Sequence, residues 1–131
     1  MNIAFAAMMT LLAPTVTGNW VTQDGSAEVA IAPCGDSVCG QVVKVLMVKP
    51  GVPGTDVHNP DASLRNRAIL GLQVLSGFKA SDDEWTDGHI YDPKTGKTYR
   101  SKLRLNDDGS LKVYGCIAFL CETQRWLRAP S

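Results

Sequence analysis

The sequence has no run of about 18 apolar residues, the length that a helix needs to cross a bilayer, so we expect no membrane-spanning helix. It also has no excess of charge, because 13 Lys and Arg residues balance 13 Asp and Glu residues. A chain without a basic block is a poor candidate for nucleic-acid binding, in which Lys and Arg neutralise phosphates. Hydrophobic residues nevertheless make up 44% of the 131 residues, which predicts one packed domain rather than a disordered chain.

The common catalytic signatures are missing as well. There is no G-x-S-x-G, H-E-x-x-H, P-loop or Rossmann fingerprint, and the chain has only two histidines, His58 and His89. We therefore expect no cofactor and no metal site. An acid–base enzyme that uses His58, or His89 together with Asp87, is the less favoured alternative.

The first residues indicate export. The segment 3–12 is uncharged, ten residues long and rich in Ala and Met, as in the apolar part of a signal peptide. No Lys or Arg precedes it, so an N-terminal arm packed on the domain is the alternative interpretation. We expect residues 1–17 to form this leader or arm, residues 18–131 to form the domain, and the protein to be periplasmic or secreted.

The four cysteines support this prediction. They form two C-x4-C pairs, Cys34 with Cys39 and Cys116 with Cys121, and an even count in a short exported chain predicts disulfides. We favour the two local pairs among the three possible connectivities. A site with four thiolates around a metal ion is the alternative, although this spacing is imperfect for zinc.

From residue 18 onward the pattern is that of strands. On the segment 98–105, Tyr99, Ser101 and Leu103 alternate with the basic residues Arg100, Lys102 and Arg104, as in a strand with one buried face. No helical pattern lies between the strands, so we do not expect parallel βαβ units. We expect an all-β, antiparallel, up-and-down barrel, with an open sandwich as the alternative. The eight expected strands are 19–22, 27–32, 40–48, 69–75, 84–91, 98–105, 111–114 and 123–127, and Ser76-Gly77 is interpreted as a turn.

One long loop, residues 50–67, interrupts the strands. Asn59 and Pro60 predict a short helix over 60–65, with Asn59 as its N-cap. The polar residues from Asp56 to Asp61 either contact a ligand or pin the loop, and pinning is favoured. Arg65 and Arg67 either bind an anionic head group or pair with Asp61 and the acidic run 82–84.

Two ends of the predicted barrel resemble the calycins, the superfamily of lipocalin-like barrels. Gly18-Asn19-Trp20 is a G-x-W at the first strand, and Arg125 and Arg128 lie near the end of the last one. In calycins a late Arg lies across this Trp at the closed end of the barrel. The resemblance implies structural roles for Gly18, Trp20, Trp126 and Arg128.

A second resemblance covers residues 18–128. The chain is similar to a family of small exported bacterial proteins known only as a domain of unknown function, which implies a lipocalin-like barrel outside the cytoplasm but no reaction. The matching stretches include Ile31-Ala32-Pro33-Cys34-Gly35, Cys39-Gly40, Asn59-Pro60-Asp61, Leu64-Arg65, Arg67, Ile90-Tyr91-Asp92-Pro93, Gly96-Lys97, Gln124, Trp126 and Arg128.

The favoured function is the binding of a small apolar or amphipathic ligand. The expected contact residues are Trp85, His89, Tyr91, Tyr99 and Leu103, with Arg65 and Arg67 for a charged group. Asn59 and Asp92 are expected to be structural, since Asp92 begins a turn. The alternative is a protein-binding or inhibitor-type barrel that acts through the 50–67 loop.

Overall fold

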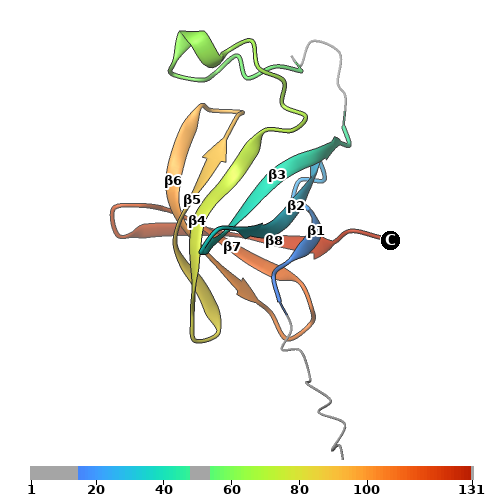
Figure 1. Ribbon diagram of the computed structural model, residues 1–131, viewed down its shortest axis with the longest axis vertical. Coiled ribbons are helices and arrows are strands. Elements are labelled where there is room, and N and C mark those ends of the chain that lie inside the picture. The colour runs from blue at the N-terminus through green and yellow to red at the C-terminus, as the bar shows by residue number, and fades with distance from the viewer. Residues whose placement is uncertain (1–14, 48–53, 131) are drawn as a thin grey trace, which may run out of the picture.

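The computed structural model describes residues 15–47 and 54–130, so the expected leader at 3–12 lies outside the described residues and stays a prediction. The described chain forms eight strands and one turn of 3-10 helix (Figure 1). The strands are β1 (Gly18–Val21), β2 (Ala27–Cys34), β3 (Ser37–Val45), β4 (Gln73–Ser81), β5 (Glu84–Asp92), β6 (Lys97–Leu105), β7 (Leu111–Ile117) and β8 (Leu120–Arg128), and the helical turn is η1 (Ala62–Leu64).

The eight strands close into a single barrel, in which each strand lies beside its neighbours in sequence and β8 returns to β1. All eight pairings are antiparallel. The expected up-and-down barrel is therefore confirmed, and the sandwich alternative is wrong. Within the described residues, no helix is long and apolar enough to cross a membrane.

Side chains fill the middle of the barrel. A Cβ atom on Gly88 would lie 2.3 Å from the ring of Phe78, and one on Gly40 would lie 3.0 Å from Leu75 and Val29. Neighbouring side chains already occupy the space that a side chain at either glycine would need, so the core is closely packed. The buried apolar residues are Val16, Trp20, Val29, Ile31, Val42, Leu72, Val74, Leu75, Phe78, Leu103, Leu111, Val113 and Trp126.

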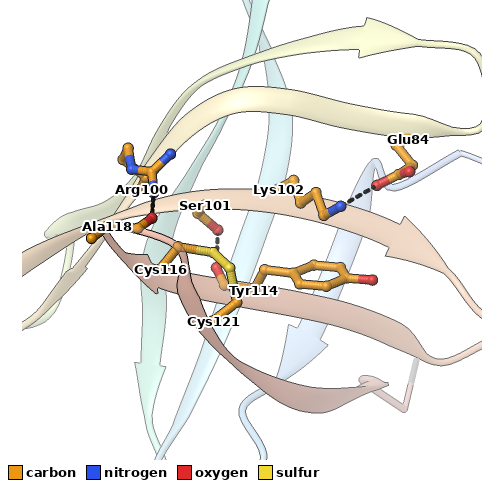
Figure 2. The surroundings of a disulfide bond; sticks show 8 residues. All are labelled: Glu84, Arg100, Ser101, Lys102, Tyr114, Cys116, Ala118 and Cys121. Carbon is orange, nitrogen blue, oxygen red and sulfur yellow. Dashed lines mark hydrogen bonds and ion pairs between the residues drawn. A yellow bond between two sulfur atoms is a disulfide. The ribbon is translucent and has the colours of Figure 1, made fainter.

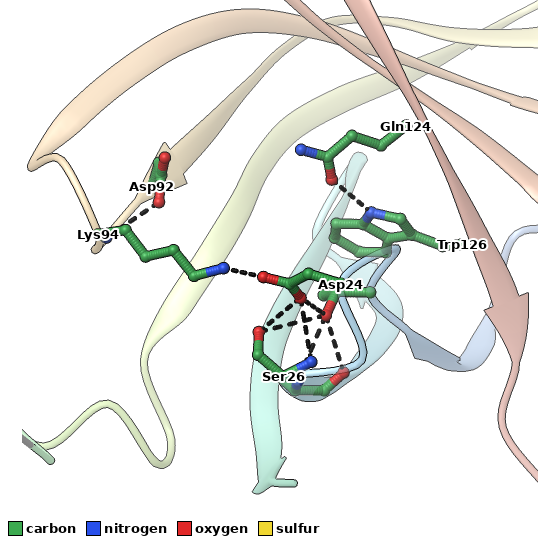
Figure 3. Close-up of polar contacts among 8 residues, drawn as sticks. Asp24, Ser26, Asp92, Lys94, Gln124 and Trp126 are labelled. Atoms are coloured by element: carbon green, nitrogen blue, oxygen red, sulfur yellow. Dashed lines mark hydrogen bonds and ion pairs between the residues drawn. The ribbon is translucent and has the colours of Figure 1, made fainter. Parts of the chain in front are cut away.

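An ion pair connects two turns at one end of the barrel. Lys94, in the β5–β6 turn, contacts Asp24, in the β1–β2 turn, and Asp24 Oδ1 also accepts hydrogen bonds from the Ser26 amide and hydroxyl (Figure 3). Two strands separate these hairpins on either side of the ring, so the pair links opposite walls. Beside it, the indole N–H of Trp126 donates to Gln124 at 2.9 Å.

At the other end, the chain before β1 is fastened to the barrel. The guanidinium of Arg128 lies 4.0 Å from the centre of the Trp20 ring and donates to the carbonyls of Thr17 and Thr15. Gly18 has a φ of 135°, and a Cβ there would lie 2.5 Å from Arg128 Nη1. Val16 is fully buried and accepts a hydrogen bond from the Trp20 indole at 2.9 Å. The packed part of the chain thus includes residues 15–17, which the sequence had placed in the leader or arm.

The local expectations for the fourth strand and for the helix are wrong. The fourth strand covers Gln73–Ser81 rather than 69–75, and Ser76-Gly77 lies inside it. Gly77 (φ 75°) on β4 and Asp87 (φ 62°) on β5 distort the two paired strands at the same level. In the sequence, a Ser-Gly pair at such a distortion looks the same as one at a turn that reverses the chain. The helix is one 3-10 turn over Ala62–Leu64, and Asp61, not Asn59, is its N-cap, because Asp61 Oδ1 accepts from the Ser63 amide.

Both local disulfides are present, Cys34–Cys39 and Cys116–Cys121, and each joins the two strands of one hairpin. The thiolate metal site is therefore wrong. We expect the paired Cys→Ser variant of either disulfide to lower the free energy of unfolding by about 2 kcal/mol, because each bond closes a short loop in the unfolded chain. Urea denaturation of the two variants and of the four-serine variant measures this. Unchanged midpoints in all three would contradict it.

Candidate functional site

A hollow of about 280 Å³ opens between the β3–β4 loop, of which residues 46–47 and 54–72 are described, and the strands β4, β5 and β6. On β6, Ser101 and Leu103 are buried, so the alternate residues Thr98 and Arg100 point outward. Tyr91 and His89 lie opposite Thr98 and Arg100 in the ladder and share this outward side. The hollow is therefore on the outer wall of the barrel, beneath the loop, and not in the interior.

The hollow is lined mainly by polar side chains. The loop contributes Asn59, Pro60 and Arg67, and the sheet contributes the rest. The sheet residues are Gln73, Val74, Ser76, His89, Tyr91 and Thr98.

The loop is held over the sheet by a buried carboxylate. Asp56 is fully buried, and its two oxygens accept from Tyr91 Oη at 2.6 Å, Asn59 Nδ2 at 2.9 Å and Arg67 Nε at 3.0 Å. The Asp56 amide donates to the Arg67 carbonyl, and Thr55 forms a β-bridge with Ala68, so the two ends of the loop meet at this point. A buried charge needs such partners, because burial without them is costly. Asp56 thus ties the loop to β5 through Tyr91.

Asn59 and Gly96 extend this attachment. Asn59 Oδ1 accepts from the Asp61 amide at 2.8 Å, and the Asn59 carbonyl accepts from Arg65 Nε at 2.7 Å. Gly96, in the β5–β6 turn, has a φ of 75°, and a Cβ there would lie 1.8 Å from the carbonyl oxygen of His58. Only glycine lets the loop approach this turn so closely. Asp92 closes the same turn by accepting from the Lys94 amide at 2.9 Å.

The hydrogen bonds set the ionisation of the buried pair. Burial by itself raises the pKa of Asp56, but hydrogen bonds from Tyr91, Asn59 and Arg67 outweigh it and hold that pKa below its ordinary value. Burial and the hydrogen bond to Asp56 raise the pKa of Tyr91 to about 12. At neutral pH the pair is a carboxylate and a neutral phenol, with the Tyr91 proton directed at Asp56.

The remaining donors face the hollow. Within the described residues, Arg67 uses Nε for Asp56, and its terminal Nη atoms form no hydrogen bond. Its guanidinium lies 5.8 Å from the centre of the Tyr91 ring, and its side chain is 39% exposed. His89 and Thr98 are exposed on the adjoining strands. A half-exposed guanidinium beside the side chains of His89 and Thr98 suits hydrogen bonding to an anion.

The structure divides the predicted contact residues between two faces. His89, Tyr91 and Arg67 line the hollow, whereas Trp85, Tyr99 and Leu103 are on the inward side of β5 and β6, and Arg65 supports the loop. Neither arginine pairs with the acidic run 82–84. That run instead meets β6, where Glu84 pairs with Lys102 and Asp83 with Arg104.

The acid–base alternative has little geometric support. Asp87 and His89 were expected to share a strand face, but the ladder is irregular between Trp85 and Gly88, and Asp87 has a left-handed φ of 62°. His58 is exposed on the loop and does not line the hollow. In the part of the chain that the structure describes, no three His, Cys, Asp or Glu side chains gather as metal ligands.

Comparisons with known proteins agree with this fold. The model of a family described as an uncharacterized protein conserved in bacteria (DUF2147) matches residues 18–128. The chain belongs to the DUF2147 family. No curated protein sequence matches it. A solved structure, a protein from the human pathogen Helicobacter pylori described as belonging to the lipocalin family, has a TM-score of 0.78 with 21% sequence identity, over 91% of this chain and 86% of that one. The expected family and lipocalin-like fold are thus confirmed.

In this DUF2147 protein, several of the residues that carry the sequence resemblance lie at or around the site. Asn59, Arg65 and Arg67 shape the loop, Tyr91 joins it to β5, and Gly96 makes room for it. Gln73, Ser76 and Thr98, which also line the hollow, carry no motif. Their only signal in the sequence is an outward position on a strand, and that depends on knowing the register.

Proposed function

We propose that this DUF2147 protein binds a small amphipathic ligand with an anionic group, and that the ligand occupies the hollow on the outer wall of β4–β6. The observation that carries the proposal is Arg67, which lines the hollow, is fixed by Asp56 through Nε, and has no hydrogen bond from its Nη atoms within the described residues. An arginine held in this way loses little conformational entropy on binding.

The interior is a poorer candidate for the ligand. Barrels of eight strands either fill with side chains or hold one small ligand. Here Phe78 covers Gly88, and Leu75 covers Gly40, so side chains occupy the middle. The hollow has about 280 Å³, near the lower end of the ~300–1,000 Å³ of drug-sized ligand sites, which fits a head group and a short chain. Val74 and Pro60 supply apolar surface for that chain.

The matched amphiphiles octyl phosphate and octanol test the proposal by isothermal titration calorimetry. We expect octyl phosphate to bind at least about tenfold more tightly, because a hydrogen bond to a charged group contributes about 1.5–3 kcal/mol and about 1.4 kcal/mol is tenfold in affinity. His89→Ala should weaken binding, whereas His58→Ala, an exposed histidine outside the hollow, should not. Binding of neither amphiphile, or an equal effect of both histidine variants, would contradict the proposal.

The identity of the natural ligand needs a separate measurement. Native mass spectrometry of protein taken from its own cells reports any retained mass. Thr98→Trp, which places an indole at the rim of the hollow, is expected to abolish that mass while leaving the thermal midpoint close to that of the parent chain.

We further infer that the protein works outside the cytoplasm, in the periplasm or beyond the cell. The two disulfide-bonded pairs and the bacterial family support this location, since disulfides persist in oxidising compartments. The apolar segment 3–12 would be the export signal.

A further inference from the structure

The β7–β8 hairpin extends beyond the barrel wall. β8 has nine residues, but β1 pairs with only two of them, Leu127 and Arg128. The first part of β8 therefore has a strand on one side only, and Figure 1 shows the hairpin projecting away from the barrel. On β8, every residue except Trp126 is exposed.

The tip of this hairpin is apolar and open to solvent. Ile117 is 60% exposed, Phe119 91% and Leu120 69%. No charged residue occurs from Tyr114 through Cys121. Ile117 and Leu120 are directly opposite in the ladder and Phe119 lies in the turn between them, so three exposed apolar side chains occupy the end of one projection. Exposed apolar groups that gather in this way mark contact with a partner or a membrane. We call these three residues the apolar tip.

The apolar tip is held in a fixed shape. Cys116 and Cys121 face each other across the hairpin and form the second disulfide (Figure 2). Between them, Ala118 has a left-handed φ of 53°, and its carbonyl accepts a hydrogen bond from the guanidinium of Arg100. A turn that is fixed before binding loses little entropy when it binds.

Positive charge lies behind the apolar tip on the outer face. Arg100 is opposite Cys116 in the ladder, and Lys102 and Lys112 lie 4.5 and 5.1 Å from the centre of the Tyr114 ring. Lys102 pairs with Glu84 at 3.3 Å. Arg100 and Lys112 have no carboxylate partner within the described residues. The only acidic residue on the projecting part of β8 is Glu122.

We propose that the apolar tip inserts into the interface of an anionic phospholipid bilayer, with Arg100, Lys102 and Lys112 against the head groups. The shape supports lipid as the partner, because Phe119 is almost fully exposed at the end of a projection and acyl chains can surround such a side chain on all sides. The charge supports it too, since membrane attachment at an interface adds apolar burial to attraction for anionic lipids. Arg100 lies opposite the hollow-lining His89 on the outer wall, but the apolar tip and the three basic residues do not line the hollow, so this proposal does not depend on ligand binding there.

Co-sedimentation with vesicles of phosphatidylcholine, with and without phosphatidylglycerol, tests the proposal. We expect binding to the anionic vesicles only, weakened by salt, and at least about tenfold weaker for Phe119→Ser/Leu120→Ser, because insertion scales with buried apolar area. Leu70→Ser, at a residue 58% exposed in the β3–β4 loop, is the matched control and should bind as the parent chain does. Lys102→Gln/Lys112→Gln should reduce binding and its salt dependence together.

A fluorescent variant detects insertion of the apolar tip directly, so the test does not rely only on the serine variant being folded. In Phe119→Trp, the emission of the new indole is expected to shift to the blue on adding anionic vesicles and to be quenched by brominated lipid, whereas the parent chain shows neither change. No binding by the parent chain, or equal binding by the serine variant and the Leu70 control, would overturn the proposal. Self-association that the serine variant abolishes, with no vesicle binding, would instead assign the apolar tip to a second copy.

Discussion

Asp56→Ala is expected to lower the free energy of unfolding by about 3–5 kcal/mol, because removing one member of a buried charged cluster leaves its partners without compensation. The Arg67 guanidinium would lose the carboxylate that it pairs with, and the Tyr91 hydroxyl would lose the acceptor of its 2.6 Å hydrogen bond. Chemical denaturation followed by tryptophan fluorescence measures the loss. Asp61→Ala is the matched control on the same loop, since Asp61 is exposed and caps only η1, so its effect should be much smaller.

A second substitution, Asp56→Asn, tests how the stability depends on pH. The pKa of Asp56 is lower in the folded chain than in the unfolded one, so its contribution to stability is present above the ordinary Asp pKa of 3.8 and is lost as the pH falls through the folded value. Asp56→Asn should therefore flatten the acid side of the stability profile and leave the neutral region with a constant deficit. Equal acid slopes in the parent chain and in Asp56→Asn would show that Asp56 does not control the loop.

Sequence patterns predicted the barrel well because strands such as β6 and β7 alternate between buried and more exposed residues. The alternation on 98–105 identified the inward residues Ser101 and Leu103, and both are buried. The hairpin of β7 and β8 was predicted too short, at 111–114 and 123–127. Its outer half has no buried face, so hydrophobic alternation ends there while the backbone ladder and the disulfide continue to Ile117 and Leu120.

The location of the candidate site was less predictable. Tyr91 and Tyr99 were expected to line one cavity, but they differ by an even number of positions on two different strands, so only the register decides their faces. The β5–β6 turn places Tyr91 opposite Thr98 and Ile90 opposite Tyr99, which sends the two tyrosines to opposite sides. The polar cluster at 56–61 did reveal a pinned loop, yet its partner Tyr91 is 35 residues from Asp56 and could not be identified from spacing.

A chain that begins at Gly18 is expected to be about 3 kcal/mol less stable than one that begins at Pro14. It would lose the burial of Val16, which contributes about 1.5–3 kcal/mol for a side chain of this size, and it would leave the buried Trp20 indole without its acceptor, at about 1–3 kcal/mol. Arg128 would also lose the carbonyls of Thr15 and Thr17. Urea denaturation of the two chains measures the difference.

Val16→Ala in the longer chain separates the contribution of apolar burial from that of the Trp20 hydrogen bond. It removes most of the buried apolar side chain but keeps the carbonyl that accepts from Trp20. Its loss of stability should be clearly smaller than that of the truncation. Equal stability of the two chains would mean that residues 15–17 do not support the barrel. If the truncation destabilises as expected, the burial of Val16 and the hydrogen bonds from Arg128 to the carbonyls of Thr15 and Thr17 contribute to the stability of the barrel.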